Sequence, residues 1–201
     1  MKLLIATRNA HKLAEFRQIL CTPGIELVGA DEVPGLPADV VEDAPTFEGN
    51  ALLKARALAQ AGHCWTMADD SGLEVDALGG EPGVHSARYA GPGACAADNN
   101  AKLLRALQGV TNRKARFRCV LALCAPDGRA WTVDGRCEGR ILEHPRGDRG
   151  FGYDPLFIPD GQERTFAELP AETKNQLSHR GQALRKAMRD WGTFLLGVCQ
   201  T

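Results

Sequence analysis

Two adjacent carboxylates, Asp69 and Asp70, are the residues of this chain best suited to do chemistry. A short apolar run at residues 64–68 precedes them and predicts a buried strand, and Ser71 and Gly72 follow them. Open α/β sheets bind ligands where such strands end. Because neighbouring negative charges repel, a cation such as Mg²⁺, which takes oxygen ligands, would offset the repulsion. The same residues also suit a polar turn, and taken alone they support a turn and a metal site equally.

The N-terminal segment offers a second candidate site, for an anion. Residues 2–6 predict a buried strand, and the polar turn Thr7-Arg8-Asn9 leads into an amphipathic helix. Backbone N–H groups at such a turn, together with the helix dipole, favour negative charge. Arg8 and Lys12 add positive charge. Thr7 and Asn9 can also serve as ordinary helix caps, and since the glycines of a Walker loop are missing, that is the simpler interpretation of these residues alone.

The segment Gly147–Pro155 is suited to binding a flat ligand. Phe151 lies between two glycines, so the backbone can approach a ligand closely while the ring stacks on it. Asp154 precedes a proline, which favours an extended conformation. A turn that holds a buried aromatic ring explains the same residues equally well.

Three basic side chains surround the expected start of the C-terminal helix. Ser178 is its expected N-cap, His179 and Arg180 occupy its first turn, and Lys174 lies just before it. Cations at this end oppose the helix dipole unless an anion or a ligand uses them. The group therefore indicates a nucleotide or phosphate site, with isolated surface charges as the alternative.

Further elements must position these residues. Residues 31–45, rich in Pro and acidic side chains, predict a loop that brings Glu42 to the next helix. Thr46 is the expected cap of that helix, and Asn50 and Lys54 share one of its faces, which alone favours a solvated surface. The other expected elements are a strand at 25–28, an ordered loop at 79–93, a helix at 98–107, a hairpin of 115–125 and 130–138, and the C-terminal helix.

Composition limits the classes of protein to consider. At 201 residues the chain can form one sizeable core, and its net charge of −1 provides no general attraction to nucleic acid or anionic membranes. No apolar run approaches the roughly 20 residues of a membrane span. The seven cysteines are odd in number and form no C-x-x-C pair, which argues against disulfides and thiolate zinc sites. We therefore expect mostly buried free thiols and a cytoplasmic protein.

Taken in order, these segments resemble one known family, the inosine/xanthosine triphosphate pyrophosphatases. Residues 7–12 are similar to its T-x-N-x-x-K opening, residues 46–55 to its T-F-x-x-N-A-x-x-K-A helix start, and residues 69–76 to its D-D-S-G-L-x-V-D block. Each motif is weak alone, but the ordered set, which runs from residue 7 to residue 184, is highly specific. The remaining matches are residues 82–83, 86–89 and 150–155, with Lys174 and residues 178–180.

The resemblance implies an α/β fold with a long mixed sheet flanked by helices, in which two lobes with a crevice between them form one pyrophosphatase domain over residues 1–201. It implies a homodimer that hydrolyses ITP, dITP and XTP to the monophosphate and pyrophosphate with Mg²⁺. Asp70 matches the family's proton acceptor and metal ligand, and Glu42 matches its second acidic metal ligand. Its substrate-binding positions match Thr7, Arg8, Asn9, Ala10, His11, Lys12, Ser71, Phe151, Gly152, Tyr153, Asp154, Lys174, His179 and Arg180.

Two positions depart from the family. Arg8 stands where many members have Gly, which could alter contacts to the phosphates. Gly49 stands where many have Glu, so the role of that Glu cannot be transferred, and Glu48 would project from a different side of the helix. Two other functions remain open: a pyrophosphatase that prefers modified pyrimidine or methylated nucleotides, and a nucleotide-binding regulator without catalysis. Concentrated acidic groups near phosphates argue against the regulator.

Overall fold

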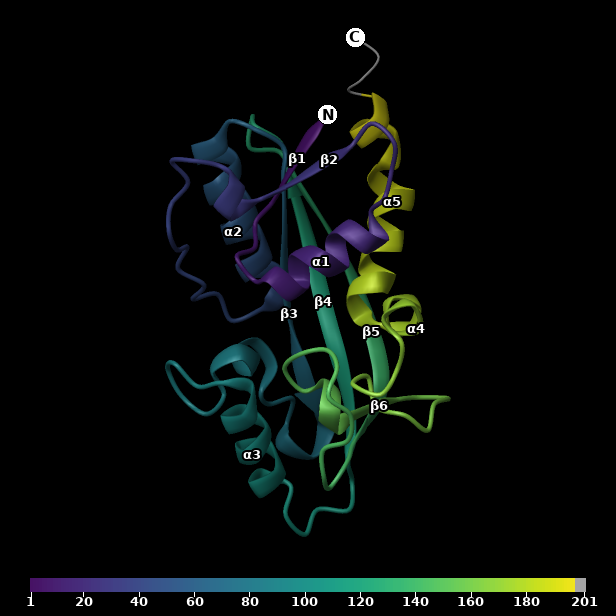
Figure 1. The fold of residues 1–201 in the computed structure, drawn as a ribbon. Coiled ribbons are helices and arrows are strands. Elements are labelled where there is room, and N and C mark those ends of the chain that lie inside the picture. Colours follow the sequence, from purple (N-terminus) through teal and green to yellow (C-terminus); the bar gives the residue numbers. More distant parts are fainter. Residues whose placement is uncertain (198–201) are drawn as a thin grey trace. The chain divides into compact units, whose positions relative to one another are not determined.

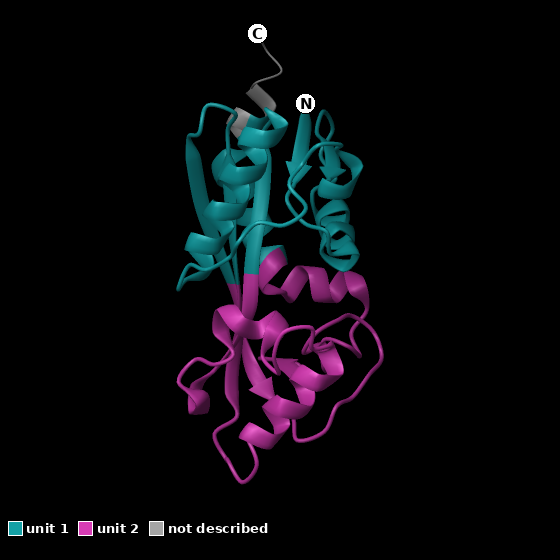
Figure 2. Ribbon diagram, turned by 90° about the vertical axis from the view of Figure 1, so that its left-hand side faces the viewer, with its two compact units in different colours: residues 1–70, 119–135, 181–201 teal, residues 71–118, 136–180 magenta. Residues whose placement is uncertain are grey.

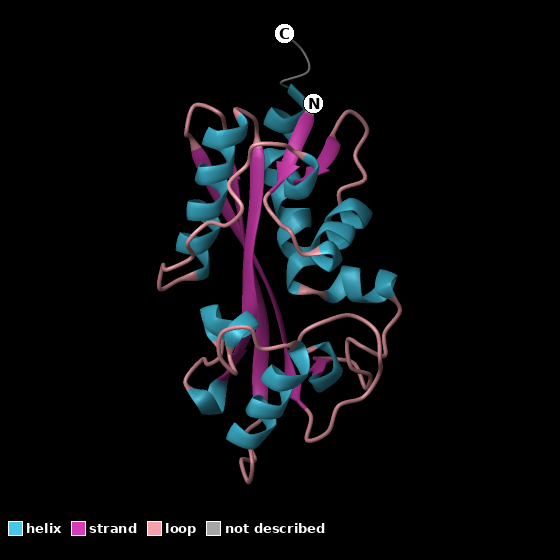
Figure 3. Cartoon of the chain, turned by 60° about the vertical axis from the view of Figure 1, so that its left-hand side comes forward, coloured by secondary structure: helices cyan, strands magenta, loops and turns pink. Residues whose placement is uncertain are grey.

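The computed structural model describes residues 1–197 and contains a mixed six-stranded sheet flanked by helices (Figures 1 and 3). The strand order is β2-β1-β3-β4-β5-β6, so the predicted α/β fold with a mixed sheet is confirmed. The strands are β1 (Lys2–Ile5), β2 (Glu26–Gly29), β3 (Thr66–Val75), β4 (Lys114–Cys124), β5 (Ala130–Ile141) and β6 (Phe157–Pro159). The helices are α1 (Ala10–Ile19), α2 (Phe47–Gly62), α3 (Ala96–Ala106), α4 (Ala171–Leu177) and α5 (His179–Gly197).

The chain divides into two compact units, which Figure 2 colours separately. Unit 1 comprises residues 1–70, 119–135 and 181–201, and unit 2 comprises residues 71–118 and 136–180. Each unit has its own group of buried apolar side chains.

In unit 1, strand β1 pairs in parallel with both β2 and β3. Leu3 and Ile5 belong to one apolar cluster with Phe16 of α1 and Trp191 of α5. Leu4, which points to the opposite face, lies near the C-terminal end of α2 and is also buried. A strand covered on both faces needs apolar residues throughout, which explains the continuous apolar run at the N-terminus.

The predicted helix caps of unit 1 are confirmed. The Asn9 side chain accepts hydrogen bonds from the backbone N–H groups of His11 and Lys12, at 2.9 and 3.2 Å. The Thr46 hydroxyl accepts a hydrogen bond of 3.1 Å from the backbone N–H of Gly49. Since each cap satisfies backbone donors that have no partner within the helix, the two helices begin at the residues that the sequence indicates.

In unit 2, a cluster of phenylalanines forms the centre of the core. Phe117 of β4 contacts Phe157 of β6 edge to face, with ring centroids 4.8 Å apart, and also packs against Phe166. Leu103 and Leu107 bring α3 onto the same cluster. Strands β5 and β6 pair antiparallel at the edge of the sheet.

The predicted hairpin is confirmed, because β4 and β5 are neighbours joined by the turn 125–129, in which Ala125 N–H donates to Arg129 O over 2.9 Å. The expectation of a strand end or a turn at Asp69–Gly72 is wrong: β3 continues through these residues to Val75. The carboxylates are tolerated inside the strand because side chains from other elements pair with them. Neither α4 nor β6 was expected from the sequence.

The thiol prediction is confirmed only in part. The six cysteines that the structure describes are all free, and Cys119, Cys124 and Cys137 are buried, but Cys21 and Cys95 are exposed. Cys199 lies outside the described residues. Within residues 1–197 no helix is both long and apolar enough to cross a membrane.

Candidate active site

Unit 1 contains an acidic cluster formed by Glu42, Asp69 and Asp70 with Lys12 and Lys54. Asp69 and Asp70 are 1% and 8% exposed. The Lys12 ammonium lies 2.9 Å from Oδ2 of Asp69. The Lys54 ammonium lies 2.9 Å from Oε1 of Glu42 and donates to the backbone carbonyl of Asp69 over 3.1 Å. Side chains from α1, α2, the 33–46 loop and β3 therefore converge in one place.

Asn50 joins the Glu42 loop to Asp70. Its Oδ1 accepts a hydrogen bond of 2.9 Å from the backbone N–H of Ala44, and its Nδ2 donates to Oδ2 of Asp70 over 3.1 Å. Asn50 is 1% exposed, and Lys54 is largely buried as well. The solvated helix face that their spacing favours is therefore wrong. The family motif was the signal in the sequence that marked these two residues.

The charges of the acidic cluster are coupled. Burial raises the pKa of the Asp70 carboxyl, and the charge of Glu42 raises it further, while the hydrogen bond from Asn50 and the charges of Lys54 and Lys12 oppose the rise. Burial alone would lower the pKa of Lys54, but attraction to Asp69, Glu42 and Asp70 outweighs it, and that pKa is raised. Lys54 is thus held as a cation among carboxylates.

The turn before α1 is arranged as a helix cap. Besides the bonds that Asn9 accepts, the Thr7 hydroxyl accepts a hydrogen bond of 3.2 Å from the Asn9 N–H. The Arg8 guanidinium pairs with the Asp31 carboxylate and donates to the Pro37 carbonyl over 2.9 Å. Ala10 and His11 form the exposed start of α1.

Unit 2 contains an aromatic–basic cluster formed by Phe151, Asp154, Lys174 and Arg180. Oδ2 of Asp154 accepts hydrogen bonds from the Phe151 backbone N–H, at 2.8 Å, and from the Lys174 ammonium, at 2.6 Å. That ammonium also lies 4.7 Å from the centre of the Phe151 ring. Gly150, at φ +74°, allows this arrangement, because a Cβ there would lie 2.1 Å from Asp154 Oδ2.

Arg180 and His179 start helix α5 inside unit 2. Arg180 is 1% exposed, donates to the Ser71 hydroxyl over 2.9 Å and places its guanidinium carbon 5.9 Å from the centre of the Phe151 ring. The His179 ring stacks on Phe117, with centroids 4.8 Å apart and planes 11° apart. The structure thus buries these basic residues, which excludes the alternative of isolated surface charges.

Two further hydrogen bonds hold the Phe151 loop, and sequence reasoning predicted neither of them. The Asn100 amide of α3 donates to the Gly152 carbonyl over 3.0 Å. The Tyr153 hydroxyl donates to the Ser86 carbonyl over 2.9 Å. Ser86 belongs to the family motif, but an exposed-looking Asn on a short helix gives no signal of this kind.

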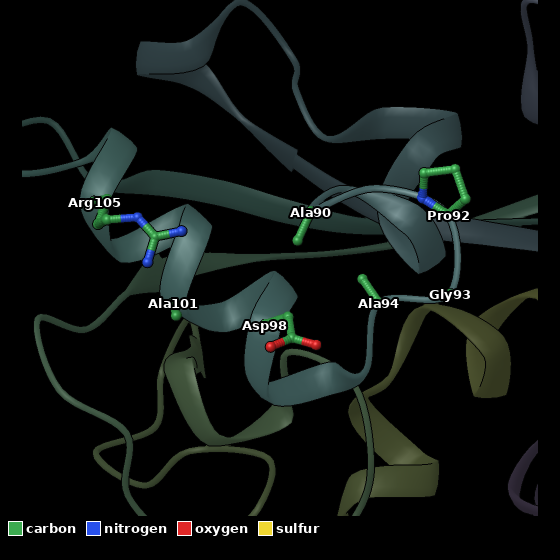
Figure 4. A pocket seen from close by; sticks show the side chains of 7 residues that line it. All are labelled: Ala90, Pro92, Gly93, Ala94, Asp98, Ala101 and Arg105. Atoms are coloured by element: carbon green, nitrogen blue, oxygen red, sulfur yellow. The ribbon is translucent and has the colours of Figure 1, made fainter.

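A cavity of about 450 Å³ in unit 2 lies apart from the predicted site residues (Figure 4). It lies between the loop after Tyr89 and helix α3, with Asp98 and Arg105 projecting from the helix. None of its lining residues is among the predicted site residues. A larger cavity of about 720 Å³ lies near the other end of α3 and likewise contains none of them.

The acidic cluster fits a magnesium ion by its chemistry. No group of three His, Cys, Asp or Glu side chains suited to a metal occurs among residues 1–197. Mg²⁺, however, usually takes only one or two carboxylates from a protein and completes its shell with phosphate oxygens and water. The Lys54 ammonium contacts Oε1 of Glu42 at 2.9 Å, and the charge of Asp70 also acts on it, so both carboxylates lie near one positive charge. Glu42 and Asp70 are therefore suitable ligands.

Comparisons with known proteins identify the family. The profile of the Ham1 family matches residues 3–190. A dITP/XTP pyrophosphatase of Desulforamulus reducens is 52% identical over 94% of each chain, and one of Syntrophobacter fumaroxidans is 51% identical over 96% of this chain and 83% of its own. The Ham1 protein of Staphylococcus aureus superposes with a TM-score of 0.86 at 40% identity, over 98% of this chain and 99% of the other. The chain therefore belongs to the Ham1 family, as its resemblance to the inosine/xanthosine triphosphate pyrophosphatases predicts.

Proposed function

We propose that this protein hydrolyses the non-standard purine nucleoside triphosphates ITP, dITP and XTP to the monophosphate and pyrophosphate, and so removes them from the nucleotide pool. The strongest support is the acidic cluster of unit 1, where lysine ammonium groups lie among buried carboxylates. Lysines suit phosphate oxygens, and carboxylates suit a hard cation and a proton acceptor. The names of the relatives from Desulforamulus reducens and Syntrophobacter fumaroxidans support the choice of substrate.

In the proposed reaction, Asp70 accepts the proton of the attacking water. General-base assistance of this kind is typically worth about 10²–10⁴-fold in rate. Asn50 keeps the Asp70 carboxylate oriented through the hydrogen bond to Oδ2. Lys12 and the start of α1 bind phosphate oxygens, for which the Lys12 ammonium exchanges its contact with Asp69. Mg²⁺, held by Glu42 and Asp70, would neutralise charge on the phosphates.

The aromatic–basic cluster of unit 2 is proposed to recognise the base. Phe151 stacks on the purine ring. The edge of the purine is contacted by the polar side chains of Asp154, Lys174, His179 and Arg180. Inosine and xanthine have a 6-oxo acceptor where adenine has an amino donor. A buried site that donates to that oxygen is left with unpaired donors when ATP binds, which can discriminate strongly.

The full set of proposed roles follows the family motifs. Asp70 is the catalytic residue, and Glu42 and Asp70 are the metal ligands. The proposed substrate-binding residues are Thr7, Arg8, Asn9, Ala10, His11, Lys12, Ser71, Phe151, Gly152, Tyr153, Asp154, Lys174, His179 and Arg180. We further infer a single pyrophosphatase domain over residues 1–201, a homodimer and a cytoplasmic location, the first two from the resemblance and the last from the free thiols.

A pyrophosphate-release assay over a nucleotide panel tests this function. We expect Mg²⁺-dependent release from dITP, ITP and XTP, little release from dATP and dTTP, and none from the Asp70→Asn variant. Preference for a modified pyrimidine or methylated nucleotide would assign a different substrate. Nucleotide binding without hydrolysis in the presence of Mg²⁺ would contradict catalysis and indicate a regulator.

A further inference from the structure

The Arg8 side chain connects three segments of unit 1. Its guanidinium pairs through Nη1 with the Asp31 carboxylate and donates from Nη2 to the Pro37 carbonyl over 2.9 Å. Asp31 lies in the short 3-10 turn 30–32 after β2, and Pro37 lies in the loop that leads to Glu42. Arg8 itself belongs to the turn that precedes α1. One planar group therefore joins the proposed phosphate-binding turn to the loop that contains a proposed metal ligand.

The loop 33–46 needs such contacts because it forms neither helix nor strand. Its far end is fixed by the hydrogen bond from Ala44 to Asn50 and by the ion pair of Glu42 with Lys54. Toward its beginning, Pro37 is held by Arg8, and Leu36 lies close to Gly62 of α2. Removing the Arg8 contact would leave the stretch between residues 37 and 41 with fewer restraints just before Glu42.

The Asp31 end of this connection is itself well anchored. The neighbouring Glu32 accepts a hydrogen bond of 3.0 Å from the Gly29 N–H and pairs with Arg17 through both carboxylate oxygens, at 2.6 and 2.9 Å. Arg17 belongs to α1, so the 3-10 turn is tied to the helix that follows Arg8. Through its contacts with Asp31 and Pro37, Arg8 therefore restrains the loop 33–46 relative to the 3-10 turn 30–32.

We propose that the Arg8 side chain is a positioning residue that holds the loop 33–46, and with it Glu42, against the turn before α1. This inference rests on the proposed function, in which Glu42 binds the metal. Arg suits the task because its fork directs separate N–H groups to a carboxylate and a carbonyl at once, whereas a Lys ammonium offers a single compact charge. The Arg8 backbone remains part of the proposed substrate-binding turn.

The test compares Arg8→Ala with Asp31→Ala. If Arg8 acts through Asp31 and Pro37, both variants raise the Mg²⁺ concentration for half-maximal activity by roughly tenfold, as is typical when a residue that orients a metal ligand is removed. The double variant is then no worse than the more damaged single variant, because the two residues act together. Arg8→Lys restores part of the loss. The exposed pair Arg129–Asp127 in the β4–β5 turn provides the matched control. Its alanine variants should leave the Mg²⁺ concentration for half-maximal activity unchanged.

If Arg8 instead contacts a phosphate of the substrate directly, Arg8→Ala and Asp31→Ala change the KM for the nucleotide in opposite directions. Removing Asp31 would then release the guanidinium and lower KM, while Arg8→Ala would raise KM. That pair of results would overturn the proposal.

Hydrogen exchange separates this inference from the proposed reaction. Amide exchange in residues 36–43 should accelerate in both Arg8→Ala and Asp31→Ala, while the melting temperature changes little, since an exposed ion pair contributes little to stability. Unchanged exchange in this segment would overturn the positioning role even in an active enzyme. Faster exchange in a protein that hydrolyses nothing would support the positioning role and contradict only the proposed function.

Discussion

The Asn50 amide and the Asp70 carboxylate form a buried hydrogen bond of 3.1 Å whose direction is fixed by the other end of the amide. Oδ1 of Asn50 accepts from the Ala44 backbone N–H, so the group that faces Asp70 must be the donating Nδ2. This bond favours the ionised form of Asp70 and opposes the rise in its pKa that burial causes. An amide is thus placed where it orients the buried Asp70 carboxylate and favours its charged form, as our proposal of Asp70 as general base requires.

Replacing Asn50 tests this relationship. Asn50→Asp retains an acceptor for the Ala44 N–H but places a second carboxyl against Asp70, whereas Asn50→Ala removes both bonds. We expect kcat/KM for dITP to fall by about 10²-fold in both, toward the lower end of what general-base assistance provides. Asn50→Asp should be at least as impaired as Asn50→Ala, because adjacent carboxylates repel. Near-normal activity in Asn50→Asp would show that the donor to Asp70 is unimportant.

Asp70→Asn should separate activity from stability. We expect kcat to fall by at least about 10²-fold, with a melting temperature at neutral pH equal to or above that of the wild type. The pKa of Asp70 is raised in the folded protein, chiefly by burial, so its ionised form costs stability.

The difference in melting temperature between Asp70→Asn and the wild type should depend on pH. As pH falls through the raised pKa toward the ordinary value, the folded wild type takes up a proton and gains stability relative to Asp70→Asn. The melting-temperature advantage of the variant should therefore shrink on acidification across that window. A variant that retains normal kcat, or that melts well below the wild type at neutral pH, would contradict the assignment.

His179 offers a clean test of base selection because its packing can be preserved. The ring stacks on Phe117, so His179→Phe keeps an aromatic ring in place while removing both ring nitrogens. We expect the preference for ITP over ATP to weaken by one to two orders of magnitude in His179→Phe and His179→Ala alike, equivalent to one buried polar group at about 1–3 kcal/mol. Only His179→Ala should lower the melting temperature. Equal losses on both nucleotides would assign His179 to phosphate binding.

The parts of the fold that could be predicted from the sequence are those determined by local patterns. The N-caps Asn9 and Thr46 are short-range features, and the β4–β5 hairpin follows from alternation around a Pro-Asp-Gly turn. The course of β3 could not be predicted, because Asp-Ser-Gly is typical of a turn. Its continuation depends on Lys12 and Asn50, which reach the carboxylates from other elements.

In the candidate site, too, local motifs could be predicted from the sequence, whereas contacts between distant elements could not. The family motifs marked the residues, but only the structure shows which of them act on one another. Lys174 is paired with Asp154 beside Phe151, which supports a role at the base, whereas its sequence alone allowed a phosphate contact. α4, which contains Lys174, is seven residues long and begins after Pro170 without a side-chain cap, so it lacks the usual start signal.

Gly49, where many family members have Glu, is required by the packing of this particular loop. A Cβ at residue 49 would lie 2.6 Å from the Ala44 Cβ and 3.2 Å from the Thr46 hydroxyl. Gly49→Glu should therefore displace the segment that presents Glu42 and destabilise the protein by about 1–3 kcal/mol, as overpacking does. Lower kcat/KM and a lower melting temperature should accompany each other.

The second substitution Ala44→Gly removes the obstructing methyl group and supplies the matched control. Because the clash involves that methyl group, the double variant Gly49→Glu/Ala44→Gly should recover most of the lost melting temperature, while Ala44→Gly alone should not exceed the wild type. Thermal unfolding of the four proteins measures the coupling directly. Additive effects of the two substitutions would show that Gly49 is needed for some reason other than its contact with Ala44.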